Sequence, residues 1–295
     1  MGAWTTADLI SSVRARGMFP DASTGSYSDA NMLRYANGEL YGKLVPAVLG
    51  VREKYYETYL DYDVTASQSS YAIPVRAIGG ALSAVQYVNN KQVYHLNPID
   101  PSQVVSITNS LIPRGFYFQN NNVVIYPTPN ATVGTLRLRY FQRPNKLEQT
   151  TNCAQISTIS TGTNEVVVSS IPATWTTATV IDFIPATFPY TVLSADKAIA
   201  GVSSTTVSFA ALPTGLAVGD WLALAEYTPI PEIPIEFQQL LVAMTLVKAL
   251  QAAGDQQNYV IAKAELDEAK SDAIKLISPR DQLGLKKVCS LWRNW

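Results

Sequence analysis

The sequence predicts an α+β fold, in which helices at both ends of the chain form a bundle and the middle is β-rich. Three observations support this class. Residues 1–60 and 234–277 carry apolar residues at helical spacing, the residues between them form short alternating or apolar runs typical of strands, and strands and helices do not alternate regularly. A chain of 295 residues is long enough for one large domain or two smaller ones.

The first 60 residues are predicted to be helical. Thr5 or Thr6 is placed to cap a helix running to about Arg16. Asp8 occupies the position that a capping box requires. Ser28 is placed to cap a second helix, and Pro46 suits the first turn of a third, which we expect to end near Tyr56.

Residues 61–149 are predicted to form strands. ETYLDYDVTA alternates large and polar side chains, and YAIPVRAIGGALSAVQYV indicates an edge segment, a break at Gly79-Gly80 and a further strand. GFYFQNNNVVIY predicts a hairpin with its turn at residues 120–122. TLRLRYFQRP places Leu136 and Leu138 on one face and the arginines on the other.

Residues 150–229 are predicted to be an inserted β domain, a small barrel or a sandwich. The segment is rich in Thr, Ser, Val and Ala, carries almost no charge, and contains short strand-like runs divided by Pro, Gly and Ser. Helices resume only after PIPEIP. This pattern favours an insertion into the helical part of the chain.

Residues 230–278 are predicted to form a helical hairpin that completes the bundle. Gly254 is a suitable C-terminal cap for the first helix and Asp255 a suitable N-cap for the second, which Pro279 ends. The first helix carries a broad apolar stripe, interpreted as the surface of a packing helix: Phe237, Leu240, Leu241, Met244, Val247 and Leu250.

Composition restricts the possible chemistry. Only 15% of residues are charged, and the net charge of −1 does not indicate nucleic-acid binding. The single histidine, His95, leaves few options for a histidine metal site or a catalytic triad. The two cysteines, Cys153 and Cys289, are far apart in sequence and do not suggest a disulfide framework, and two buried or idle thiols are favoured over a bond between them. We expect no cofactor, no metal and no membrane span.

A few residues are candidate sites, and each of them also has an ordinary structural interpretation. Asp61 and Asp63 lie on one strand face, where they suit a cation or an acid pair, although solvated acids are the favoured interpretation. Arg137 and Arg139, with Arg143 beyond, form either a phosphate-facing stripe or, as favoured, an outward polar face. The Glu, Asp and Lys residues within 263–275 are interpreted as the solvent-exposed face of an amphipathic helix.

The C-terminal segment 279–295 differs from the rest of the chain. Four basic residues against one acid give it a charge of +3, and since the whole chain carries −1, residues 1–278 carry −4. Chain ends are usually polar and frayed unless a partner holds them. We expect an extended tail that docks on a partner, or one that folds back on its own subunit.

The succession of segments resembles head-to-tail adaptor (connector) proteins of tailed bacteriophages. The segments are LRYANGELYGKLVPAVLGVREKYYETYLDYDVTA, YAIPVRAIGGALSAV, VVIYPTPNATVGTLRLRYFQRPN, LPTGLAVGDWLALAEYTPIPEIPIEFQQLL and the terminal SPRDQLGLKKV. The resemblance extends along nearly the whole chain. One departure is DQLGL at residues 281–285, which is more apolar than the Gly/Ser-rich stretch expected before the lysines.

The resemblance implies a non-catalytic virion protein, made in the host bacterial cytoplasm and located in the neck at the portal vertex. Such adaptors form a ring, typically of twelve copies, beneath the portal protein, extend the DNA channel, and offer a platform to tail, nozzle or tail-fibre proteins. Genomic DNA would pass without sequence-specific binding. The portal-docking tail would use Pro279, Arg280, Leu285, Lys286, Lys287, Val288, Leu291, Trp292, Arg293 and Trp295.

Two other functions remain open on the sequence. A tail or receptor-binding protein would use the inserted β domain as a carbohydrate-binding module, which requires exposed aromatic residues among Trp175, Phe188, Tyr190 and Trp221. A hydrolase would have to depend on His95, the only histidine.

Overall fold

The computed structural model describes residues 3–277 except 20–24, 26 and 104–111. The chain forms two compact units, Met1–Arg52 with Asn145–Trp295, and Glu53–Pro144. Helices and a closed barrel occupy the first unit, and two small sheets occupy the second. The α+β class and the β-rich middle are therefore confirmed.

The caps of the helices of the first unit lie where the sequence predicts them. Thr5 and Asp8 form the expected capping box, Ser28 accepts from the Asn31 N–H, and Gly254 adopts the left-handed conformation with φ 76°. Asp255 accepts from the Asn258 N–H at the start of the last helix. The helices are α1 (Thr6–Gly17), α2 (Asp29–Glu39), a π-helical turn (Leu40–Leu44), α3 (Val45–Val51), α4 (Gln238–Ala253) and α5 (Gln256–Ile277).

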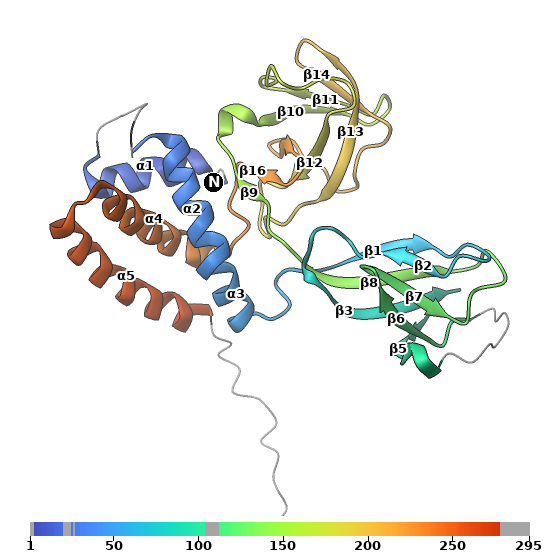
Figure 1. Cartoon of the computed structure of the whole chain (residues 1–295). Coiled ribbons are helices and arrows are strands. Elements are labelled where there is room, and N and C mark those ends of the chain that lie inside the picture. Colours follow the sequence, from blue (N-terminus) through green and yellow to red (C-terminus); the bar gives the residue numbers. More distant parts are fainter. Residues whose placement is uncertain (1–2, 20–24, 26, 104–111, 278–295) are drawn as a thin grey trace, which may run out of the picture. The chain divides into compact units, whose positions relative to one another are not determined.

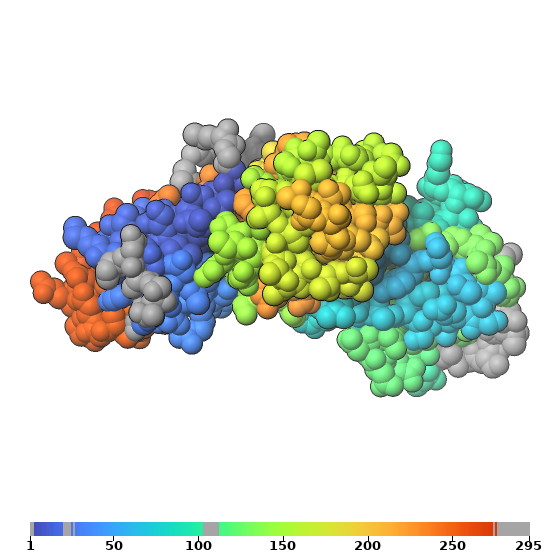
Figure 2. Space-filling model, turned by 90° about the horizontal axis from the view of Figure 1, so that it is seen from above, coloured from blue at the N-terminus to red at the C-terminus, as the bar shows by residue number. Residues whose placement is uncertain are grey.

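Helix α4 is in contact with α1, α2 and α5, although about 200 residues or more separate α1 and α2 from α4 in the sequence. Figures 1 and 2 show the blue N-terminal and red C-terminal helices gathered in the same part of this unit. Val242 and Leu246 are buried as well as the predicted stripe, so α4 is covered on more than one side.

The predicted third helix is wrong at its end. It was expected to continue to about Tyr56, but α3 ends at Val51 and the chain reaches the first strand at Glu57. A π-helical turn precedes α3, in which the Val45 N–H donates to the Leu40 carbonyl. Pro46 has no N–H and its ring crowds the preceding turn, which accounts for the wider turn at this point.

The inserted β domain is a closed six-stranded barrel with the strand order β10-β11-β14-β13-β12-β15. Its interior is filled by apolar side chains, including Phe183, Ile181 and Val166, which are fully buried. The strands are β10 (Ala154–Ser160), β11 (Glu165–Val168), β12 (Val180–Ile184), β13 (Ser194–Ser203), β14 (Thr206–Phe209) and β15 (Trp221–Leu224).

Two short parallel strands hold the ends of the barrel segment together. Strand β9 (Lys146–Leu147) pairs with β16 (Tyr227–Thr228). Asn37 of α2 donates to the Leu147 carbonyl and accepts from the Leu147 N–H, which ties this pair to the helices. The buried Asp182 accepts from the Asn145 side chain at 2.6 Å and from the Glu226 N–H at 3.0 Å.

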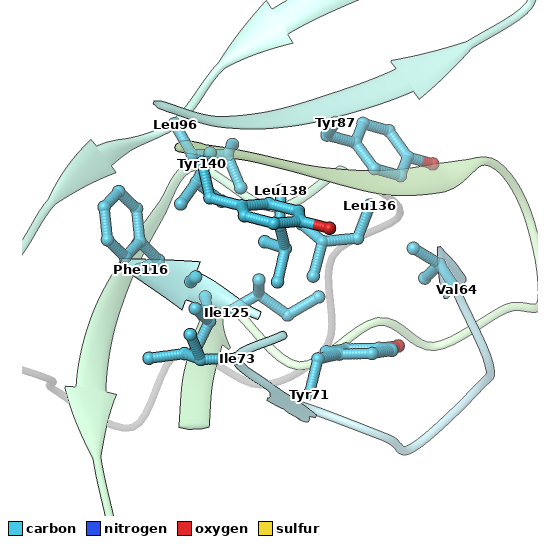
Figure 3. Packing of buried hydrophobic residues seen from close by; sticks show 13 residues of the cluster. Val64, Tyr71, Ile73, Tyr87, Leu96, Phe116, Ile125, Leu136, Leu138 and Tyr140 are labelled. Atoms are coloured by element: carbon cyan, nitrogen blue, oxygen red, sulfur yellow. The ribbon is translucent and has the colours of Figure 1, made fainter. Parts of the chain in front are cut away.

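The second unit contains two four-stranded sheets that pack on a shared core. The first has the order β1-β8-β3-β4 and the second β2-β7-β6-β5. Figure 3 shows Leu136, Leu138 and Tyr140 from one sheet facing Phe116 and Ile125 from the other. The strands are β1 (Glu57–Asp63), β2 (Ser70–Ala72), β3 (Ala77–Asn89), β4 (Gln92–His95), β5 (Asn97–Pro98), β6 (Gly115–Gln119), β7 (Asn122–Tyr126) and β8 (Thr135–Gln142).

Two predictions about turns in this unit have opposite outcomes. The hairpin β6–β7 is confirmed, with positive φ at Asn120 and Asn121. The expected break at Gly79-Gly80 is wrong, because β3 runs continuously through both residues. Their positive φ values and the shifted register against β8 absorb the irregularity as a bulge within one strand.

Candidate functional site

The outer face of the β1-β8-β3-β4 sheet brings together polar residues that are far apart in sequence. In the register of this sheet, Asp61 of β1 lies opposite Arg137 of β8, Arg137 opposite Gln86 of β3, and Gln86 opposite His95 of β4. We call these four residues, with Tyr59 and Arg139, the outer-face row. Sequence reasoning singled out Asp61, His95, Arg137 and Arg139 separately, and the sheet places them together.

Strand alternation explains why these side chains face outward. On β8, Leu136 and Leu138 are fully buried and Tyr140 nearly so, whereas Arg137 and Arg139 between them are partly exposed. The core requires the apolar set on the inner side, so the arginines must lie on the other. The predicted alternation of this strand is confirmed.

The Asp61–Arg137 pair is the strongest interaction in the row. The Nε and one terminal guanidinium nitrogen of Arg137 donate to the two carboxylate oxygens of Asp61, each at 2.8 Å. The guanidinium carbon also lies 4.0 Å from the centre of the Tyr59 ring. The hydrogen bonds to Asp61 raise the pKa of Arg137 above its ordinary value. Both side chains are partly exposed, so the pair contributes on the order of 0–1 kcal/mol to stability.

The row continues through Gln86 to the edge of the sheet. Arg139 Nε donates to Gln86 Oε1 at 3.2 Å, and Gln86 Nε2 lies 3.4–3.5 Å from the ring nitrogens of His95. Gln86 is only 6% exposed although it lies on the outer face, where it contacts Arg139 and His95. His95 is exposed at the edge strand.

This arrangement suits recognition better than proton transfer. Arg137 engages Asp61, so these two charges compensate each other and Asp61 does not form a free acid pair with Asp63. In the residues that the structure describes, no group of three His, Cys, Asp or Glu side chains is placed to hold a metal ion. Tyr and Arg on a partly exposed sheet face are the residue types enriched in protein interfaces.

The register of the sheet, and not a sequence signal, determines two members of the row. Gln86 lies between core residues in AVQYV, and Tyr59 lies in a segment whose alternation is that of an ordinary strand. No local pattern marks either residue as a neighbour of Arg137. Only the pairing of β1 with β8 and of β8 with β3 shows it.

The aromatic residues of the barrel do not form an exposed cluster. Trp175 and Tyr190 are 4% and 7% exposed, Trp221 is partly buried, and Phe188 is 47% exposed. A carbohydrate-binding face needs aromatic rings that a sugar can reach. The burial of Trp175 and Tyr190 therefore counts against the carbohydrate-binding alternative.

Cys153 and the predicted packing stripe are buried, and the predicted docking tail lies outside the described residues. Burial raises the pKa of the Cys153 thiol to about 12, which leaves it inert near neutral pH. All members of the predicted packing stripe are buried in the chain's own core: Phe237, Leu240, Leu241, Met244, Val247 and Leu250. The docking-tail residues from Pro279 to Trp295, Cys289 among them, lie outside the described residues.

A pocket of about 640 Å³ lies along α1 in the first unit. Ile10 and Phe19 line its apolar part, and Ser11, Thr150 and Thr151 supply hydroxyl groups. Arg14 at this pocket is paired with Asp29. Its lining is therefore largely neutral.

Comparison with known proteins places the chain in a family. The model of a family described as SU10 adaptor protein matches residues 4–182, more than half of the chain. The match includes α1 to α3, the whole second unit and the barrel as far as β12. No curated protein matches the chain. None of the helices that the structure describes has the length and apolar character of a membrane span.

Proposed function

We propose a function that proceeds from one premise: the chain belongs to the SU10 adaptor protein family. It is therefore a bacteriophage adaptor protein, a structural component of the virion that interacts with portal and tail proteins. This membership confirms the resemblance stated from the sequence. The family match over residues 4–182 is the observation that carries the more detailed proposal.

In that proposal, copies of the chain assemble into a ring, of about twelve subunits, below the portal protein in the neck of the virion. The ring extends the DNA channel and provides a platform on which tail, nozzle or tail-fibre proteins assemble. Each subunit needs a rigid body for this role. The burial of α4 against α1, α2 and α5 supports such a body.

In this proposal the chain has four parts with different roles. Residues 1–60 and 230–278 build a helical domain that forms the ring, and residues 61–149 form a β region. Residues 150–229 form the inserted barrel, and residues 279–295 dock on the portal. The contacts of α4 with both N-terminal helices support the joining of the two helical segments into one domain.

The tail carries the chemistry expected of a docking peptide. Trp292 and Trp295 offer apolar anchors, and Lys286, Lys287 and Arg293 offer positive charge to acidic groups on the portal. Segments of this kind fold when they bind and can cover a large partner surface. Repetition around a ring multiplies a modest affinity per tail into stable attachment.

The charge of the chain suits a DNA conduit. Residues 1–278 carry about −4 and so offer no strong electrostatic trap for phosphates, which would slow the passage of DNA. In this proposal genomic DNA is in transit and is not a ligand. The protein needs no cofactor and performs no catalysis, is made in the host cytoplasm, and acts in the virion.

Co-sedimentation with the portal ring of the same phage tests the proposal. The full chain should sediment with the portal in near-stoichiometric amounts, and a chain that ends at Ser278 should not. Trp292→Ala with Trp295→Ala should lose most of the binding, whereas Asn294→Ala is the matched control in the same segment. Equal binding by the full and truncated chains would keep the adaptor and reject the docking role of the tail. Binding by neither would reject the neck assignment.

A further inference from the structure

The first sheet of the second unit leaves two strands with one neighbour each. In the order β1-β8-β3-β4, β1 pairs only with β8 and β4 only with β3 among the described strands. A strand with one neighbour presents backbone N–H and C=O groups that another strand can bind. We call these two sides of the sheet the β1 edge and the β4 edge.

Hydrogen bonds already formed show which residues of β1 point their backbone groups away from the sheet. The Gln142 N–H donates to the Tyr56 carbonyl, and the Val64 N–H donates to the Gly134 carbonyl. Alternation in an antiparallel pair then directs residues 58, 60 and 62 toward β8 as well. The backbone groups of Tyr59, Asp61 and Asp63 therefore point outward at the β1 edge.

Hydrogen bonds already formed also show which residues of β4 point their backbone groups away from the sheet. A two-residue turn, Asn90-Lys91, joins β4 to β3 with positive φ at both residues, and the Leu96 N–H donates to the Val85 carbonyl. Residues 92, 94 and 96 therefore bond to β3. The backbone groups of Val93 and His95 point outward at the β4 edge.

Strand direction makes the two edges compatible. Each neighbouring pair in this sheet is antiparallel, so with four strands β1 and β4 run in opposite directions. When two copies lie side by side in the same orientation, β4 of one copy meets β1 of the next as antiparallel strands. A ring of identical subunits requires such a contact between two different surfaces of the same chain.

We propose that β4 of one copy pairs with β1 of the next, so that the sheets of successive copies join edge to edge. This inference rests on the proposed function, which supplies copies in one orientation around a ring. Among the registers that oppose outward residues, we choose the one that leaves Asp61, which already binds Arg137, away from Lys91, and it places His95 opposite Tyr59 and Val93 opposite Asp61. It also brings the Lys91 side chain opposite Asp63.

Charge distribution favours this pairing over a contact between two like edges. Strand β1 carries Glu57, Asp61 and Asp63 and no basic residue, whereas the turn before β4 carries Lys91. Two β1 edges would place acids against acids, which is unfavourable across a strand pair. The mixed contact brings Lys91 to Asp63 and covers the side chain of Val93, which is 49% exposed in the single chain.

Disulfide formation between engineered cysteines on the portal-bound assembly tests the inference. The background is the full chain with Cys289→Ser, in which the buried Cys153 stays in place. Tyr59→Cys with His95→Cys puts two thiols on opposed residues, whose Cα atoms would be about 5.5 Å apart in a hydrogen-bonded antiparallel pair. Mild oxidation should then give a ladder of covalent oligomers on a non-reducing gel.

Two controls separate the possible contacts. Tyr59→Cys alone should give no covalent dimer, and a dimer would show that like edges meet, which overturns the inference. Tyr59→Cys with Phe118→Cys uses a residue on the second sheet that is 54% exposed, and it should give no ladder. If subunits bind the portal but the 59/95 variant gives no ladder, the edge pairing is wrong and the adaptor function stands. If no subunits bind the portal, the proposed function fails and the edge pairing fails with it.

A charge exchange provides an independent test that leaves the strands intact. Lys91→Glu and Asp63→Lys should each raise several-fold the concentration at which copies associate, because each places like charges opposite one another. The double variant Lys91→Glu with Asp63→Lys should restore association. Lys197→Glu, an exposed lysine of the barrel, is the matched control. Failure of the double variant to recover would overturn the proposed register.

Discussion

The barrel and the first sheet of the second unit differ in how the strands at the ends of their sheets are paired. In the barrel, β10 pairs with both β11 and β15, so the sheet closes and every strand has two neighbours. In the sheet β1-β8-β3-β4, the two outer strands each pair with one neighbour among the described strands. A closed barrel has no edge strand with unpaired backbone groups, whereas the edge of an open sheet can pair with a strand of a partner.

The two structures also differ in the polarity of their side chains. The barrel segment carries little charge, and its interior is filled by apolar residues. The open sheet carries a row of charged and polar groups across its outer face and further charges at its edges. A surface that holds specific polar groups can discriminate between partners. The comparison predicts that core changes in the barrel affect folding and that changes at the open sheet affect association.

Truncation of the barrel core should have the largest effect on stability. Phe183 is fully buried and packs against Phe209 with ring centroids 5.0 Å apart. Phe183→Ala should lower the free energy of unfolding of the barrel by about 3–5 kcal/mol, measured by urea unfolding through tryptophan fluorescence. Val93→Ala at the open edge should change it by less than about 0.5 kcal/mol. A loss below about 1 kcal/mol for Phe183→Ala would contradict the closed, packed interior.

Two glycines with positive φ should respond differently to alanine. Gly134 has φ 80°, and an added Cβ would lie 2.7 Å from the ring of the buried Tyr87, whose hydroxyl donates to the Val133 carbonyl. Gly219 near the barrel has φ 97° and open space around it. Thermal unfolding should show a loss of about 2–3 kcal/mol for Gly134→Ala and about 1 kcal/mol for Gly219→Ala. Equal losses would show that contact with Tyr87 is unimportant.

The buried thiol at the barrel predicts a pH dependence. Folding raises the pKa of Cys153 from 9.0 to about 12. Between these values the unfolded chain releases the thiol proton and the folded chain keeps it, so stability should fall as pH rises through this window. The loss should approach about 1.4 kcal/mol at one pH unit above the ordinary value.

The measurement compares urea midpoints at pH 8 and pH 10 for the chain and for Cys153→Ala, because the tyrosines also titrate in this range. The substituted chain should lose less stability between the two pH values. A thiol reagent at pH 8 should react with Cys153 only after unfolding. Rapid reaction of the folded chain in the Cys289→Ser background would contradict the burial of this group.

Loss of the surface ion pair should have only a small effect on folding. Arg137→Ala removes the contacts with Asp61 and Tyr59, and both partners are partly exposed or exposed. The expected change in the free energy of unfolding is about 0.5–1 kcal/mol, and Arg137→Lys should lie between the two proteins because it keeps the charge but not the paired hydrogen bonds. A loss above about 2 kcal/mol would show that the pair supports the sheet itself.

Local signals in the sequence predicted the features that depend on a few neighbouring residues. The caps at Thr5, Ser28 and Gly254 and the Asn-rich hairpin turn are of this kind, because their chemistry acts within one turn of the chain. The alternation of β8 also identified its buried face. The α+β class followed from the order of these local patterns.

Features that depend on long-range pairing were not predictable from one sequence. The outer-face row requires β1, β8, β3 and β4 to pair in a particular register, and β1 and β8 are separated by more than 70 residues. The closure of β10 on β15 likewise distinguishes a barrel from a sandwich. The glycines alone indicate a break at Gly79-Gly80, but pairing with β8 keeps β3 continuous there and the irregularity becomes a bulge in β3.

The parallel pairing of β9 with β16 has a consequence for how this protein can vary. Antiparallel neighbours can be joined by a tight turn, but parallel neighbours need a crossover of about a dozen residues or more. The barrel is therefore the crossover connection between β9 and β16, and this connection is itself a folded module. A shortened or exchanged version is compatible with the helices if the new segment still spans this crossover, whereas deletion to a short loop would separate β9 from β16.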